Sequence, residues 1–171
     1  HYNEDNGFGN KKNFDVWVTP GERDSLFALN VIKLISNSTE WSQCSLRIKV
    51  VNSNNSSYNL VYNKVEEIMA QLRISGEILI INNELEDKPV KDLIASHSTD
   101  ADVIFIAVPP NGNYNEKYDY MSNISQIDKT IIFVKASTEF QSIGNLDIIT
   151  KQLLQPEQTA VTEQDVELQL L

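Results

Sequence analysis

The sequence predicts an α/β protein with a three-layer, doubly wound sheet of five mostly parallel strands. Five short runs of β-branched and other apolar residues are separated by segments with helical periodicity. The runs are apolar at nearly consecutive positions, which is typical of parallel strands covered on both faces. Pro, Gly and Asn residues flank most of these runs. The simplest open order for this alternation is 3-2-1-4-5, which places strands 1 and 4 side by side where strand order reverses.

The first strand, helix and strand organise the rest of the chain. A strand at 14–18 is followed by a Pro-Gly break, a helix at 22–36 and a second strand at 46–51. The start of this helix has residues that cap helices or suit their positive end, namely Glu22, Asp24 and Ser25. Because the helix is apolar on most sides, we expect more than its own sheet to cover it.

The rest of the chain repeats the alternation. Apolar residues recur at helical spacing between polar loops, and a Ser-Gly pair, a Pro residue and a Pro-Pro pair mark the breaks. These patterns predict a helix over about 61–73, a strand at 78–81, a short helix at 89–97, a strand at 102–108, a helix at 115–128 and a strand at 131–134.

The chain divides into one domain and two flanking segments. Residues 1–13 are polar and Asn-rich, which is typical of a tail or a linker. Residues 14–155 form the α/β domain and end in a helix through Ile148 and Leu154 that Pro156 should stop. Residues 156–171 form a carboxy-terminal tail that has enough spaced apolar residues for a short amphipathic helix.

Charge and composition exclude several classes of protein. The net charge is -10, and the 14 Lys and Arg residues are scattered, so we expect no nucleic-acid partner. The single cysteine, Cys44, excludes an internal disulfide and fits a reducing compartment. Because no run of eighteen apolar residues occurs, we expect no direct membrane insertion by this chain.

No catalytic, cofactor-binding or metal-binding residue is predicted, and we expect no cofactor. The loops after strands 1 and 4 lack clustered glycines, and no G-x-G-x-x-G or phosphate-loop pattern occurs anywhere. His97 has no metal-ligand partners at suitable spacing and is interpreted as a helix-end residue. A group of acidic residues before this helix is interpreted as a solvated cluster, namely Glu84, Glu86 and Asp87.

Several segments together resemble a known family. They are residues 11–18, a Trp-x-x-Cys-x-x-Arg run from Trp41 to Arg47, and the segments 72–74, 101–110, 120–121 and 130–135. In this order they resemble the cytoplasmic carboxy-terminal region of cation-chloride cotransporters, the sodium-potassium-chloride and potassium-chloride symporters. The resemblance covers residues 11 to about 136. The chain departs from the family at Val18, where a second Trp is usual, at the lone Gly21, and at Lys135-Ala136 in place of Arg-Gly.

The resemblance implies the second universal-stress-protein-like subdomain of such a transporter. It implies a non-catalytic regulatory and assembly domain at the cytoplasmic face of the membrane, with the upstream cytoplasmic and transmembrane parts of the same transporter as partners. It also implies association in pairs, so we expect a homodimer. Ion symport itself would belong to the membrane part. The alternative is a free-standing universal-stress-type nucleotide-binding protein, which the fold class alone favours.

Two further expectations come from the residues themselves. The first helix and the segment through Ile148 and Leu154 carry more apolar surface than one sheet face needs, so we expect self-association unless an upstream half of the domain covers that surface. Glu22 and Asp24 would occupy the positive end of the first helix, and Pro109 and Pro110 stiffen the loop after strand 4. We therefore expect no ATP binding at the point where strand order reverses.

Overall fold

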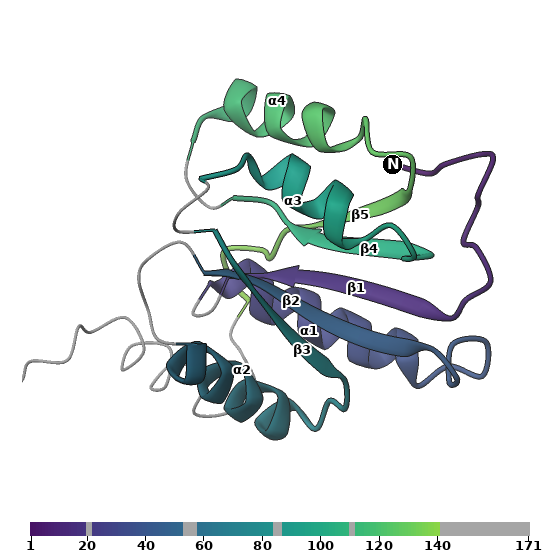
Figure 1. The fold of residues 1–171 in the computed structure, drawn as a ribbon, viewed down its shortest axis with the longest axis vertical. Coiled ribbons are helices and arrows are strands. Elements are labelled where there is room, and N and C mark those ends of the chain that lie inside the picture. Colours follow the sequence, from purple (N-terminus) through teal and green to yellow (C-terminus); the bar gives the residue numbers. More distant parts are fainter. Residues whose placement is uncertain (20–21, 53–57, 84–86, 110–111, 141–171) are drawn as a thin grey trace, which may run out of the picture.

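The computed structural model describes residues 1–19, 22–52, 58–83, 87–109 and 112–140 as a three-layer α/β domain (Figure 1). All neighbouring strands are parallel, and the sheet order β3-β2-β1-β4-β5 confirms the prediction. The strands are β1 Asn13–Val18, β2 Ser45–Asn52, β3 Glu77–Asn82, β4 Val103–Ala107 and β5 Thr130–Val134. The predicted terminal helix and the tail 156–171 lie outside the described residues.

In the described residues, four helices cover the two faces of the sheet. They are α1 Arg23–Ser36, α2 Tyr58–Leu72, α3 Val90–His97 and α4 Tyr114–Ile124. In Figure 1, α1 and α2 lie on one side of the sheet and α3 and α4 on the other. This arrangement follows from right-handed crossovers, because the chain moves outward from β1 to β3 and then returns in the opposite direction to β4 and β5.

Both boundaries of α4 differ from the prediction for identifiable reasons. The α4 helix begins at Tyr114 because Asn113 caps it: the Asn113 side chain accepts from the Glu116 backbone N–H at 3.1 Å, and Glu116 accepts from the Asn113 backbone N–H at 3.1 Å. The same helix ends at Ile124, not near 128, because the chain leaves the helix in a turn in which the Ile127 N–H bonds to the Ile124 carbonyl oxygen.

The core consists of two apolar layers, one on each face of the sheet. The layer under α1 and α2 includes Phe14, Ile48 and Phe105, each at most 1 % exposed. The layer under α3 and α4 includes Ile104, Ile94 and Ile124. Alternate residues of β1 therefore enter different layers, which explains why these strands are apolar at consecutive positions.

Residues 1–12, predicted as a tail or linker, lie along the amino ends of the strands (Figure 1). The His1 amino group donates to the Ile131 carbonyl oxygen at 2.9 Å, and the Ile131 N–H donates to the His1 carbonyl oxygen at 2.9 Å. At the other end of the segment, the Asp102 carboxylate accepts three backbone N–H groups, from Asn10, Lys12 and Asn13, at 2.7 to 2.9 Å. The segment is thus fixed to both β5 and the start of β4.

The Asp102 carboxylate also accounts for the glycine at position 9. Partial burial alone would raise the pKa of Asp102, but the three backbone N–H groups outweigh it and hold this pKa below its usual range. Gly9 has a φ of +57°, and a Cβ atom there would lie 2.0 Å from Asp102 Oδ1. Only glycine combines this left-handed conformation with such a close approach.

None of the helices in the described part of the chain is both long and apolar enough to cross a membrane.

Candidate functional site

A cavity of about 300 Å³ lies at the carboxyl ends of β1 and β4, where strand order reverses. Its walls are mainly apolar and include Trp17, Ile106, Val108 and Tyr120. Its position is the one expected for a ligand in an open α/β sheet. Burial raises the pKa of Tyr120 to about 12, so this hydroxyl stays neutral at physiological pH.

The start of α1 gives this cavity an acidic rim. Burial, and secondarily the nearby Asp24 carboxylate, raise the pKa of Glu22, while Lys135 acts in the opposite direction. Asp24 is itself buried and accepts hydrogen bonds from Lys135 Nζ at 3.0 Å and from the Ala136 N–H at 2.8 Å. Asp24 lies in the first turn of α1, as predicted, and also ties α1 to the segment after β5, whereas Glu22 at the N-cap position makes no capping bond.

The remaining polar groups at the start of α1 are also engaged within the protein. Ser25 is buried, and its hydroxyl oxygen accepts the Thr19 N–H at 2.9 Å. Arg23 directs one guanidinium N–H to the Thr138 carbonyl oxygen at 3.3 Å. None of the described residues that line the cavity is Lys, Arg or His. The cavity thus has room for an apolar or aromatic group, but it offers no positive side chain to a phosphate.

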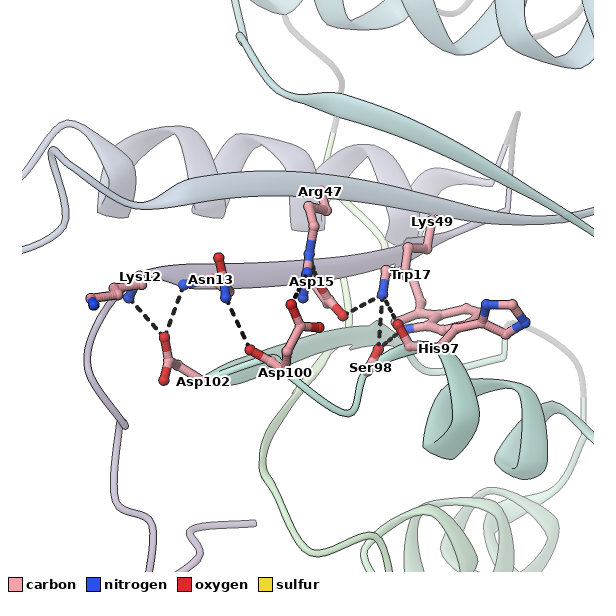
Figure 2. A network of polar contacts seen from close by, with 10 residues as sticks. All are labelled: Lys12, Asn13, Asp15, Trp17, Arg47, Lys49, His97, Ser98, Asp100 and Asp102. Atoms are coloured by element: carbon pink, nitrogen blue, oxygen red, sulfur yellow. Dashed lines mark hydrogen bonds and ion pairs between the residues drawn. The ribbon is translucent and has the colours of Figure 1, made fainter.

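A second polar constellation, shown in Figure 2, is buried between the sheet and α3. Asp15 of β1 is fully buried and accepts from Lys49 Nζ and from Arg47 Nε, each at 2.6 Å. Arg47 also binds Asp100 at 2.6 Å, and this hydrogen bond holds the pKa of Asp100 below its usual range. The register of the parallel pair β1 and β2 places Asp15 beside Arg47 and Trp17 beside Lys49.

The Lys49 ammonium group connects this cluster to the end of α3. It donates to the His97 carbonyl oxygen, it lies 3.4 Å from Ser98 Oγ, and it stands 5.8 Å from the centre of the Trp17 ring. The indole N–H of Trp17 bonds to the same Ser98 hydroxyl at 3.1 Å. Because protein groups already occupy the donors of this ammonium group, the cluster is suited to fixing α3 against the sheet and not to holding a substrate.

Sequence reasoning did not identify the residues of this buried cluster. The available signal was the placement of Asp15, Arg47 and Lys49 inside otherwise apolar strands, because a charge within such a run must be paired or neutralised. Their spacing of two residues along β2 also puts Arg47 and Lys49 on one face.

The other predicted residues do not form a site in the described part of the chain. His97 lies at the end of α3, and its side chain is exposed, while its carbonyl oxygen binds Lys49. Glu84 and Glu86 lie outside the described residues. Within the ranges that the structure describes, no group of three or more His, Cys, Asp or Glu residues could hold a metal ion.

Comparisons with known proteins bear on the fold alone. No family model matches the chain, and no curated protein matches it. A solved structure, a universal stress protein in complex with cAMP, is similar with a TM-score of 0.56 and 14% sequence identity. The similarity covers 74% of this chain and 98% of that one. The five parallel strands in order 3-2-1-4-5 with four helices thus form a universal-stress-protein-like α/β fold.

Proposed function

We propose that this chain is a non-catalytic regulatory and assembly domain of a membrane transporter, placed at the cytoplasmic face of the membrane. The observation that favours this proposal over phosphate binding is the acidic rim of the cavity where strand order reverses. Glu22 and Asp24 are set at the start of α1, and no Lys, Arg or His is among the described lining residues. In this proposal the fold serves as a platform for protein contacts and not as a phosphate-binding site.

The cation-chloride cotransporters are the family proposed for the parent protein. The support is the resemblance in sequence, and two of its residues have clear structural roles in this chain. Trp41 stacks on Phe14 with ring centres 4.2 Å apart, and Arg47 bonds to the buried Asp15. In this proposal the domain pairs with a second copy of itself, and its other partners are the upstream cytoplasmic and transmembrane parts of the same transporter.

An antibody raised against this chain tests the proposal in the source cells. After fractionation and denaturing electrophoresis, we expect the antibody to detect a band in the membrane fraction that is far larger than the 19.4 kDa of this chain. Blocking the antibody with the purified chain should remove that band. A single species near 19.4 kDa in the fraction that is free of membranes would contradict the proposal.

A free-standing nucleotide-binding protein is the second candidate, and two observations favour it. The cavity lies where ligands bind in open α/β sheets, and its aromatic residues Trp17 and Tyr120 offer apolar surface to a base. The similar solved structure is a universal stress protein in complex with cAMP. The comparisons support this candidate more directly than the transporter, whereas the charge of the rim opposes it.

Titration calorimetry separates the two candidates. With ATP and magnesium, and separately with cAMP, we expect no saturable heat at low micromolar concentrations, because the phosphates would meet Glu22, no described residue of the cavity wall is Lys, Arg or His, and Lys135 is already paired with Asp24. The Glu22→Gln variant is the matched comparison, since it removes one negative charge from the rim at nearly constant size. A low micromolar Kd for the unmodified chain, lost on Trp17→Ala, would instead establish the second candidate.

A further inference from the structure

A second apolar cavity, of about 280 Å³, lies at the opposite end of the strands from the cavity described above. Phe14 and Val103, which are neighbours at the start of β1 and β4, belong to its wall, and each is 1% exposed. We call it the amino-end cavity. Ligand pockets usually measure about 300–1,000 Å³, so this one suits a single small ring and not a nucleotide. Four of its described lining residues are aromatic, namely Phe8, Phe14, Trp41 and Phe105.

These aromatic side chains contact one another in a row from the core to the surface. Phe105 is fully buried and meets Phe14 edge to face, with ring centres 5.6 Å apart. Trp41 stacks on Phe14 at 4.2 Å. On the outer side, Phe8 is 45% exposed and meets Trp41 edge to face at 6.2 Å. The wall of the cavity therefore offers ring faces and edges, with which another aromatic ring packs well.

The exposed side of the cavity carries one charge of each sign. Lys11 and Glu40 both line it, and Lys11 Nζ lies 3.0 Å from Glu40 Oε2 and 5.6 Å from the centre of the Trp41 ring. The two side chains are 40% and 68% exposed, so their ion pair contributes little to stability and exchanges partners at little cost. A ligand in the cavity can therefore meet either charge with a polar group.

The segment that carries Phe8 and Lys11 is held in place by the protein itself. It runs along the amino ends of the strands (Figure 1). The Asp102 carboxylate accepts the backbone N–H groups of Asn10 and Lys12, the residues on either side of Lys11. The lining residues of this segment are thus positioned before any ligand binds, which lowers the entropic cost of binding.

We propose that the amino-end cavity binds a free aromatic α-amino acid, with its ring among the aromatic side chains, its carboxylate at Lys11 and its ammonium group at Glu40. An α-amino acid carries both charges on one carbon atom, which suits two side-chain charges as close together as Lys11 Nζ and Glu40 Oε2. A ligand with a single charge would attract one of these side chains and repel the other. An aromatic residue within a polypeptide would fill the cavity but would bring no charge for either side chain.

Titration calorimetry of the full chain with three small probes tests this inference. The probes share a phenyl ring and differ in charge: L-phenylalanine, 3-phenylpropionate, which lacks the ammonium group, and 2-phenylethylamine, which lacks the carboxylate. We expect a Kd of about 1 mM or below for L-phenylalanine, which its small size allows. Each of the other two probes should bind at least about tenfold more weakly.

Two variants assign the two charges of the ligand. Lys11→Met should remove the advantage of L-phenylalanine over 2-phenylethylamine, because the carboxylate then meets no cation. Glu40→Gln should remove the advantage of L-phenylalanine over 3-phenylpropionate for the corresponding reason. The matched control is Lys12→Met, which changes an exposed lysine of the same segment that is not among the described lining residues. This control should keep both ratios of Kd values.

Either of two results would overturn the inference. The first is the absence of saturable heat with L-phenylalanine up to about 10 mM. The second is equal affinity for the three probes, which would mean that the cavity takes an aromatic group whatever its charge. Neither result bears on the membrane-fraction experiment or on the titrations with ATP and cAMP, which concern the parent protein and the cavity at the other end of the strands.

Discussion

The Lys49→Met variant should lose about 3–5 kcal/mol of unfolding free energy, because it leaves a fully buried carboxylate without one of its two cationic partners. Met keeps most of the apolar stem of Lys49, so lost packing contributes little. Arg47 still binds Asp15, which places the expected loss toward the lower end of that range. Urea unfolding followed by circular dichroism measures the difference.

Two further variants test whether the unpaired Asp15 carboxylate causes the loss of stability in Lys49→Met. Lys11→Met removes an ion pair with Glu40 in which both side chains are exposed, so we expect a change of at most about 1 kcal/mol. The double variant Lys49→Met with Asp15→Leu removes the buried negative charge as well and should recover part of the stability lost by Lys49→Met alone. A loss for Lys49→Met as small as that for Lys11→Met would contradict a buried, charged pair.

The Phe14→Ala variant should lose about 3–5 kcal/mol, the usual cost of emptying a fully buried aromatic site. Phe14 is 1% exposed, stacks on Trp41 at 4.2 Å and meets Phe105 edge to face at 5.6 Å. The change therefore opens a cavity and removes two aromatic contacts at the junction of β1, β4 and the end of α1.

Phe8→Ala is the matched control for the Phe14→Ala variant. Phe8 also contacts Trp41, with ring centres 6.2 Å apart, but it is 45% exposed, so its loss should cost at most about 1.5 kcal/mol. Urea unfolding compares the two variants, and near-ultraviolet dichroism reports the environment of Trp41. Equal losses for Phe8→Ala and Phe14→Ala would show that burial at Phe14 is not what stabilises this junction.

The order of the strands was predictable because hydrophobic periodicity and crossover handedness constrain the topology strongly. The apolar run at 102–108 predicted a strand covered on both faces, and Val103 to Ile106 of β4, which lies between β1 and β5, are indeed buried. The role of Asp102 was not predictable. Its three backbone partners come from residues 10–13, and a contact across about ninety positions leaves no periodic signal in the sequence.

The candidate site was predictable in position but not in detail. The rule for open α/β sheets placed it after strands 1 and 4, and the cavity lies there. Asp24 lies in the first turn of α1 as predicted, but Glu22 makes no capping bond, and Lys135 and Ala136, which follow β5, compete for the Asp24 carboxylate. Such competition depends on tertiary contacts that local propensity does not describe.

The pairing of His1 with Ile131 has a consequence for synthesis of the chain on the ribosome. The two residues are 130 positions apart, so at about 5–20 residues per second His1 waits several seconds for its partner. β4 is also without its outer neighbour until β5 emerges, so its open edge is exposed to other nascent chains. Slow translation before residue 130 would therefore favour aggregation over folding.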